Sequence, residues 1–313
     1  MTKIAFVFPG QGAQKVGMGQ DVAAEYPEAK KIYDDADERL GFSITEIITE
    51  GPIELLTKSE NAQPALVSTS VAILRALETY GVKADYVAGH SLGEYSALVA
   101  GGFLEASDAI YLVRKRGELM EAAVPNGAGA MAAVLGVDRE TLKTITEEVT
   151  KEGDAVQLAN LNCPGQIVIS GTTAGVEKAG EKAKESGAKR VLPLAVSGPF
   201  HSSLMEPAAL AFLDVLAEVK ISDGQIPVVN NVDAKETTDK SEISDKLIKQ
   251  IYSPVLWEDI VEELIKNGVD TFVEIGSGKV LAGLIKKINR DVTVLSAGDA
   301  ESVKSVAATL KGE

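Results

Sequence analysis

A serine between two glycines is the first feature of this sequence that can carry chemistry. The motif GHSLG, residues 89–93, follows the short apolar run 85–89 and precedes the helix-forming run 92–102. In a nucleophile elbow, a tight turn between a strand and a helix exposes the serine Oγ, and the backbone N–H of the next residue points at the developing oxyanion. Ser91 is therefore the candidate nucleophile, and Leu92 supplies the N–H.

A general base must activate Ser91, and histidine is the usual one. The chain has only two histidines. His90 adjoins the serine, so its side chain should leave the turn in another direction, and we assign it a packing or orienting role. By elimination His201, in SGPFHSSLMEP, is the candidate base. No acidic residue between Ser91 and His201 stands out as the partner of the imidazole, and a backbone carbonyl can accept its N–H instead.

An arginine in an apolar helix stripe is the third candidate. The run 107–124 places Arg116 among apolar or small residues at helical spacing, namely Ala109, Leu112, Val113, Gly117 and Met120. A guanidinium on a buried face is costly unless an anion accompanies it. An internal Asp or Glu and a substrate carboxylate are equally acceptable partners on this pattern alone.

The elements that must position these residues alternate between strand and helix, which predicts a doubly wound α/β sheet. Strands are expected at 3–8, 85–89, 226–232, 271–276 and 292–298. Between about 127 and 193 the order changes to strand, helix, strand, strand, helix, strand. We predict a large α/β-hydrolase-like domain with a parallel sheet (1–126 and 194–313) and an inserted ferredoxin-like subdomain (127–193), with a cleft between them.

Composition narrows the possible functions. The 313 residues carry a formal net charge of −15, which argues against general affinity for nucleic acid or anionic membranes. The single cysteine, Cys163, cannot form an internal disulfide and fits a reducing compartment. No signal peptide or membrane span is recognisable, so we expect a cytoplasmic protein. No cluster of His, Cys and Asp has metal-ligand spacing, so we expect no metal site.

A series of short motifs connects these candidates to a known family. In order, they are FPGQGAQ (8–14), QPAL (63–66), GHSLGEYSA (89–97), Arg116, PGQIVISG (164–171), GPFH (198–201), NNVDA (230–234), QIYSPV (250–255) and EIGSGKVL (274–281). Together they resemble the malonyl-CoA:acyl carrier protein transacylases of bacterial fatty acid synthesis, to which the acyltransferase domains of polyketide synthases are related. The resemblance covers nearly the whole chain.

The resemblance implies a role for each site residue. Ser91 would be the nucleophile, His201 the base, and Arg116 the ligand of the malonyl carboxylate. The backbone N–H groups of Gln11 and Leu92 would form the oxyanion hole. The main-chain carbonyl of Gln250 would orient His201, and Phe200 would determine acyl selectivity. The bulk of Phe200 would crowd an α-methyl branch.

The resemblance also implies the reaction and its partners. Malonyl would move from malonyl-CoA to the phosphopantetheine thiol of acyl carrier protein, with no cofactor of the enzyme's own; we expect a monomer. One rival is a serine hydrolase with the same elbow, and a second is a non-catalytic module that binds the carrier protein. A basic stretch, 279–290, contains Lys279, Lys286, Lys287 and Arg290 without an acidic neighbour until Asp291, and is the expected docking surface for an acidic carrier protein.

Overall fold

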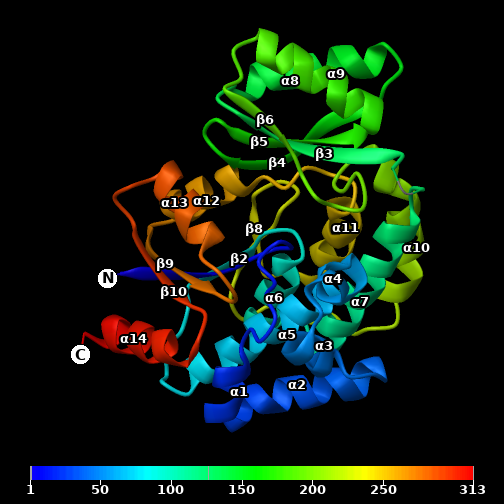
Figure 1. Cartoon of the computed structure of the whole chain (residues 1–313). Helices are drawn as coiled ribbons and strands as arrows, with labels where there is room; N and C mark the ends of the chain where they lie inside the picture. The colour runs from blue at the N-terminus through cyan, green and yellow to red at the C-terminus, as the bar shows by residue number, and fades with distance from the viewer. Residues whose placement is uncertain (1, 126, 313) are drawn as a thin grey trace.

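A six-stranded sheet forms the centre of the larger part of the molecule. The computed structural model describes residues 2–125 and 127–312 (Figure 1). The strand order is β10-β9-β1-β2-β7-β8, and all neighbours are parallel except β7 and β8. The bounds are β1 (Lys3–Phe8), β2 (Tyr86–Gly89), β7 (Val228–Val229), β8 (Glu236–Thr237), β9 (Val269–Ile275) and β10 (Thr293–Ala297).

Helices cover both faces of this sheet (Figure 1). Their bounds are α1 (Gln20–Glu25), α2 (Pro27–Leu40), α3 (Ile44–Glu50), α4 (Ile53–Thr57), α5 (Ser59–Glu78), α6 (Gly93–Ala100), α7 (Ala106–Ala122), α10 (Glu206–Leu216), α11 (Lys240–Gln250), α12 (Trp257–Lys266), α13 (Val280–Ile288) and α14 (Ala300–Lys311), with a short 3-10 helix at Ser203–Met205.

The two faces of β1 explain why its sequence is a continuous apolar run. Phe6 and Phe8 belong to the core that contains α5, α6 and α7, whereas Ala5 and Val7 belong to the core that contains α12 and α13. Side chains alternate between the faces of a strand, so a strand buried on both faces must be apolar throughout. This central position fixes the end of β1, at Phe8, beside the end of β2.

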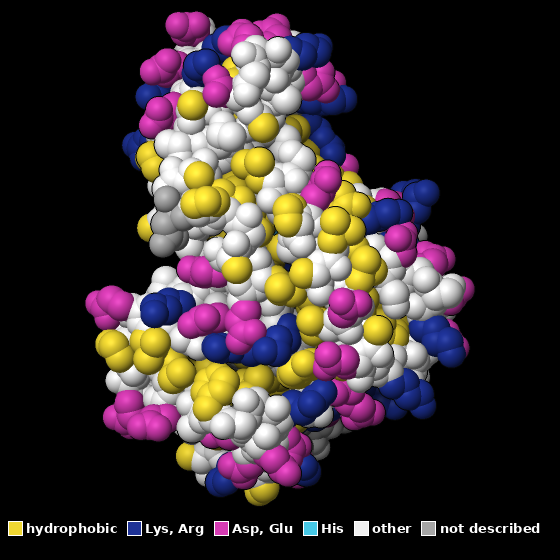
Figure 2. Space-filling view, turned by 90° about the vertical axis from the view of Figure 1, so that its right-hand side faces the viewer, with side chains coloured by type: hydrophobic (Ala, Val, Ile, Leu, Met, Phe, Trp, Pro, Cys, Tyr) yellow, Lys and Arg dark blue, Asp and Glu magenta, His cyan; other side chains and the backbone are white. Residues whose placement is uncertain are grey.

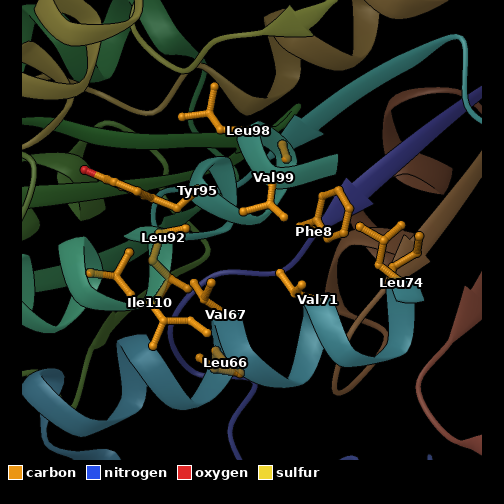
Figure 3. Packing of buried hydrophobic residues seen from close by; sticks show 14 of the residues in the cluster. Phe8, Leu66, Val67, Val71, Leu74, Leu92, Tyr95, Leu98, Val99 and Ile110 are labelled. Carbon is orange, nitrogen blue, oxygen red and sulfur yellow. The ribbon is translucent and has the colours of Figure 1, made fainter. Parts of the chain in front are cut away.

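The core around α5 supports the turn that carries Ser91. Figure 3 shows side chains of this core from β1, α5, α6 and α7, which are Phe8, Leu66, Val67, Val71, Leu74, Leu92, Tyr95, Leu98, Val99 and Ile110. All are at most 4% exposed. Full burial of a large apolar side chain stabilises a fold by about 1.5–3 kcal/mol. The start of α6 is therefore held by packing and not only by its own hydrogen bonds.

A second, antiparallel sheet lies above the first (Figure 1). Its strand order is β4-β5-β3-β6, and α8 and α9 pack on one face. The bounds are β3 (Gly129–Leu135), α8 (Arg139–Lys151), β4 (Val156–Cys163), β5 (Gln166–Thr172), α9 (Thr173–Glu185) and β6 (Arg190–Pro193). On the opposite face, Met131, Ala159 and Val168 join the core of the larger part. The small sheet thus closes over the edge where β1 and β2 end.

The two parts also share backbone hydrogen bonds. The N–H of Leu161 in β4 donates to the carbonyl of Val255, and the N–H of Val255 donates to the carbonyl of Ala159, both within 2.9 Å. Figure 2 shows the molecule from the side of α10, with the narrower part that carries the small sheet set on the wider part and charges of both signs mixed over the surface. No helix among the described residues is long and apolar enough to span a membrane.

Candidate active site

Ser91 lies on a sharp turn between β2 and α6, with a φ of 53°. A Cβ atom on Gly89 would lie 2.0 Å from the backbone of Gly93, and one on Gly93 would lie 2.2 Å from the carbonyl oxygen of Phe8. Neither approach is possible for a larger residue, so both glycines are needed for the turn. The nucleophile elbow predicted from the GHSLG motif is therefore present in its geometry.

Asn231 braces this turn from both sides. Its Oδ1 accepts a hydrogen bond from the backbone N–H of Ser91 at 2.8 Å, and its Nδ2 donates to the carbonyl of Gly89 at 2.6 Å. Asn231 is fully buried. A positive φ at a serine is strained by about 1–3 kcal/mol, and persists only where the surroundings enforce it. Sequence analysis found Asn231 only as part of the NNVDA motif and gave it no role.

His201 faces the nucleophile, as its selection by elimination predicted. Its Nε2 lies 2.7 Å from Oγ of Ser91, and its Nδ1 lies 2.9 Å from the carbonyl oxygen of Gln250. A carbonyl can only accept, so Nδ1 carries the proton and Nε2 is left free to take one from Ser91. Burial, followed by the charge of Arg116, lowers the pKa of His201 to about 3. The imidazole is therefore neutral at pH 7.

Arg116 is buried, as its place in the apolar stripe predicted, with 1% of its surface exposed. Its Nη1 donates to Oε1 of Gln63 at 2.7 Å, and its Nη2 donates to Oγ of Ser91 at 3.0 Å and to Oε1 of Gln250 at 2.9 Å. Among the described residues, no carboxylate lies within 4.0 Å of the guanidinium. The sequence left two partners open for Arg116, an internal Asp or Glu and a substrate carboxylate. The described residues place no internal acid within ion-pair distance of it.

A cavity of about 160 Å³ adjoins these groups. Its lining includes Gln11, Ser91, Arg116, Phe200 and His201, so it brings together the predicted residues that come from four distant parts of the chain. Within the described part of the chain, the backbone N–H groups of Gln11 and Leu92 have no hydrogen-bond acceptor. Two unengaged N–H donors near a nucleophile are what an oxyanion requires.

A second cavity, of about 250 Å³, shares Gln11 and His90 with the first. It continues between the two parts of the molecule to Leu281 and Leu284 on α13 and to Asn162 on β4. The two hollows thus adjoin each other next to Ser91, which lines the first of them.

The comparison with known proteins decides the family. The model for "Acyl transferase domain" matches residues 5–311. The chain belongs to the acyl transferase domain family. It is 56% identical over 313 residues to a malonyl CoA-acyl carrier protein transacylase of Bacillus subtilis, covering 100% of this chain and 99% of the relative. It is 49% identical over 304 residues to one of Staphylococcus aureus, covering 97% and 98%.

Solved structures of acyl transferases are equally similar. An acyl carrier protein S-malonyltransferase from Vibrio cholerae superposes with a TM-score of 0.95 at 45% identity, covering 97% of this chain and all of the other. A malonyl-transacylase solved in complex with a type II polyketide synthase acyl carrier protein superposes with a TM-score of 0.95 at 42% identity, with both chains fully covered. These likenesses span both sheets of the acyl transferase described above.

His90 and Cys163 lie outside the reacting group of this acyl transferase. Nε2 of His90 is 2.8 Å from Oδ1 of Asn162, and its ring packs against Trp257 with centroids 5.7 Å apart. Burial lowers the pKa of His90. Cys163 is a buried thiol at the end of β4, and burial raises its pKa. Neither side chain hydrogen-bonds to Ser91 in the described structure, and the position of His90 is consistent with the packing or orienting role expected for it.

Besides Asn231, three side chains of the site were given no role by sequence analysis. Gln63 contacts Arg116, and Gln250, known in advance only for its carbonyl, also uses its side-chain amide. Nε2 of Gln250 donates to Oε2 of Glu94 at 2.6 Å and to the carbonyl of Ser91 at 3.0 Å. Glu94 is fully buried, and burial raises its pKa to about 7. The described residues include no cluster that could hold a metal ion.

Proposed function

We propose that this acyl transferase moves a malonyl group from malonyl-CoA to the phosphopantetheine thiol of acyl carrier protein, in fatty acid biosynthesis. The observation that carries the proposal is the buried guanidinium of Arg116, which lies 3.0 Å from Oγ of Ser91 and has no carboxylate among the described residues as its partner. A carboxylate supplied by the acyl group would complete a charge-assisted pair. The names of the relatives and the solved complex with an acyl carrier protein support the same reaction.

The reaction proceeds in two half-reactions at Ser91. Nε2 of His201 takes the Oγ proton while Oγ bonds to the thioester carbon of malonyl-CoA. The carbon–sulfur bond then breaks, the proton passes from Nε2 to the sulfur, and CoA leaves as a thiol. The carrier thiol next gives its proton to Nε2, its sulfur bonds to the ester carbon, and Oγ leaves with that proton. The malonyl group ends on the carrier protein.

The backbone stabilises the charges that develop in both half-reactions. The N–H groups of Gln11 and Leu92 receive the oxyanion, and one such donor contributes about 3 kcal/mol to the transition state. The carbonyl of Gln250 holds Nδ1–H of His201 in place of the acid of a hydrolase triad. The lowered pKa of His201 keeps the base neutral before each attack. No metal or redox cofactor takes part.

Arg116 and Phe200 select the acyl group. Arg116 binds the malonyl carboxylate, and the bulk of Phe200, which lines the same cavity, would crowd an α-methyl branch. When Oγ of Ser91 has become an ester oxygen, it is a poorer acceptor. The N–H of Arg116 that pointed at Oγ is then free for the carboxylate.

The acidic carrier protein docks on the exposed side of α13. Lys279, Lys287 and Arg290 are exposed there, and Leu281 of the same segment lines the second cavity. The ammonium of Lys286 is also exposed at the surface but already donates to the carbonyls of Arg290 and Val292. Lys287 likewise donates to a neutral group, the side-chain oxygen of Gln166. Lys279, Lys287 and Arg290 carry positive charge without an acidic partner among the described residues, beside the opening that the pantetheine arm enters.

The proposal includes the division of the chain into domains, its cell compartment and its oligomeric state. Residues 127–193 are an inserted ferredoxin-like subdomain, and 1–126 with 194–313 an α/β-hydrolase-like domain; the strand orders of the two sheets support this division. The protein works as a cytoplasmic monomer that binds neither nucleic acid nor membranes, in keeping with its net charge of −15.

The test is to mix the protein with malonyl-CoA labelled in the malonyl group, with and without carrier protein. Without carrier, mass spectrometry should find the added malonyl mass on the peptide that contains Ser91. With carrier, the label should move to the phosphopantetheine thiol. Release of free malonate at the same rate in both mixtures would instead indicate a hydrolase. Label on Cys163, label nowhere, or undiminished transfer by Ser91→Ala would contradict the mechanism.

A further inference from the structure

Glu94 is a buried acid beside the reacting groups that the proposed mechanism does not use. It belongs to the first turn of α6, three residues after Ser91, and only 2% of its surface is exposed. A buried carboxylate is costly unless hydrogen bonds satisfy it. Nε2 of Gln250 donates to it at 2.6 Å, and the backbone N–H of Asn231 also favours its charged form. Glu94 thus touches the residue that orients His201 and the residue that braces the elbow.

The side-chain amide of Gln250 has donors and acceptors on opposite sides. Its Nε2 faces the Glu94 carboxylate and the carbonyl of Ser91, while its Oε1 accepts from Nη2 of Arg116. A carboxylate oxygen cannot bond to Oε1, so Glu94 dictates which way round the amide lies. If the amide turned over, its N–H groups would face those of the guanidinium.

The charge of Glu94 matters to Arg116 as well. Burial lowers the pKa of Arg116, while the charge of Glu94 acts in the opposite direction and favours the guanidinium. No carboxylate in the described chain lies within ion-pair distance of Arg116. Glu94 therefore balances the charge of Arg116 across the intervening amide of Gln250. The side of the guanidinium that faces Ser91 stays free of an internal anion.

We propose that Glu94 is a positioning residue for acyl selectivity: through the amide of Gln250 it holds Arg116 aimed at the acyl group on Ser91. The inference rests on the proposed function. It makes Glu94 part of the preference for malonyl over acetyl groups, although Glu94 touches neither.

The first test compares Glu94→Gln with a matched control, Glu274→Gln, at pH 8. The neutral Gln keeps the size of Glu94 but has only one oxygen for two N–H donors, so the amide of Gln250 loses its fixed orientation. Glu274 is as buried, its pKa is likewise raised to about 7 by burial, and it accepts from the backbone N–H groups of Leu281 and Ala282 instead. The ratio of kcat/KM for malonyl-CoA to that for acetyl-CoA should fall about tenfold in Glu94→Gln, as expected for one weakened bond to a charged group. The ratio should not change in Glu274→Gln.

A double-mutant cycle asks whether Glu94 acts through Arg116. In the Arg116→Ala background, Glu94→Gln should leave the malonyl-to-acetyl ratio unchanged, because the group that it positions is gone. A further fall of the same size in that background would overturn the proposal.

The wild-type protein offers a test that does not depend on the folding of a variant. The charged groups that act on Glu94 are Arg116 on α7 and Lys246 on α11, while burial raises the pKa of the neighbouring Tyr95, which stays neutral between pH 8.5 and 6. Protonation of Glu94 turns one of its two accepting oxygens into an O–H donor, which weakens its hold on the amide of Gln250, so the preference for malonyl-CoA should decline as the pH falls from 8.5 to 6. The base His201 serves both thioesters equally and cancels in the ratio.

The outcomes separate this inference from the proposed function. If the wild-type protein does not form malonyl-Ser91, the proposed function fails. If it does, but the ratio is constant between pH 8.5 and 6 and the same in Glu94→Gln, Glu94 has only a structural role. An equal loss of the ratio in Glu274→Gln would also contradict the inference, because it would be a general effect of removing a buried charge.

Discussion

Nε2 of His201 lies 2.7 Å from Oγ of Ser91, and both residues have positive φ angles, 57° and 53°. Each such residue is strained by about 1–3 kcal/mol, so the surroundings must hold the pair in place. Asn231 accepts from the backbone N–H of Ser91, and the carbonyl of Gln250 accepts from Nδ1–H of the His201 ring. The nucleophile and base are thus positioned by neutral amide groups.

The titration of His201 follows from this environment. Burial, followed by the charge of Arg116, lowers its pKa to about 3. The chain has only two histidines, so imidazole carbon NMR signals are few, and His201→Gln assigns them. We expect the His201 signal to show no protonation shift between pH 8 and 5. A midpoint near the usual value of about 6.5 would contradict the proposed environment.

The same lowered pKa has a consequence for stability. Below about pH 6.5 the unfolded chain binds a proton at this histidine and the folded chain does not, so the free energy of unfolding contributed by His201 falls as the pH drops toward 3. Glu94, whose folded pKa is raised to about 7, acts oppositely and loses its contribution as the pH rises through 7. Urea unfolding of His201→Gln should therefore show less loss of stability than the wild type between pH 6.5 and 4.5.

Asn231→Ala should slow the reaction more than its effect on folding explains. The substitution leaves the backbone N–H of Ser91 and the carbonyl of Gly89 without partners, at about 1–3 kcal/mol for each buried group. The elbow can then relax from its positive φ. We expect kcat for malonyl transfer to fall at least tenfold, measured by the release of CoA under saturating substrate.

Asn230→Ala is the matched control for this prediction. Asn230 is equally buried, but it bonds to Lys235 and to the N–H groups of Val232 and Asp233 in its own turn. It should lose a comparable amount of thermal stability with little change in kcat. Equal losses of kcat in the two variants would mean that the whole turn matters, and not the two bonds of Asn231 to the elbow.

Sequence analysis found the site residues whose type is scarce in this chain or whose position in a pattern is unusual. A chain with two histidines offers one candidate base, and an arginine at the helical period of an apolar stripe predicts burial. The roles of Gln250, Gln11 and Phe200 came from the resemblance and not from their own pattern. Amides and carboxylates are common, and nothing local marks Glu94, which meets Gln250 across 156 residues. Contacts between residues so far apart in the sequence form only when the chain folds, so a local sequence pattern does not reveal them.

The predicted strand 226–232 shows the same limit for the fold. Only Val228 and Val229 form β7, because Asn230 and Asn231 use their side chains to bond backbone groups instead of continuing the sheet. The predicted strand 3–8 coincides with β1, and the strands 85–89, 271–276 and 292–298 differ from the observed ones by one or two residues at their ends. Buried parallel strands are continuous apolar runs, which is why their positions could be predicted.

Charge reversal on α13 tests the docking surface. Lys287→Glu with Arg290→Glu should raise KM for acyl carrier protein severalfold, most at low salt, since exposed charges are screened over about 10 Å at 0.1 M. Transfer to free pantetheine should not change. Lys30→Glu with Lys31→Glu, on α2 at the far end of the molecule, is the charge-matched control (Figure 1). An equal loss with both acceptors, or an equal loss in the control, would argue against docking on α13.

Arg116→Ala should change which acyl group is used without preventing acyl transfer. Arg116 is 1% exposed, and among the described residues its guanidinium hydrogen-bonds only to Gln63, Gln250 and Ser91, so its removal breaks no ion pair of the described chain. What it removes is the partner of the malonyl carboxylate. Hydrogen bonds to charged groups contribute about 1.5–3 kcal/mol, which corresponds to a loss of about ten- to more than a hundredfold in kcat/KM for malonyl-CoA.

Acetyl-CoA makes no use of that charge, so its kcat/KM should fall much less in Arg116→Ala, and acyl-Ser91 should still form from it. Ser91 keeps its hydrogen bond to His201, and the N–H groups of Gln11 and Leu92 are unaffected. Steady-state kinetics with both thioesters on the folded variant measure the ratio, and thermal unfolding measures stability separately. A parallel fall in both activities with a large loss of stability would make Arg116 structural. An unchanged ratio would mean that the malonyl carboxylate binds elsewhere, because a group that holds it cannot be removed without affecting malonyl-CoA more than acetyl-CoA.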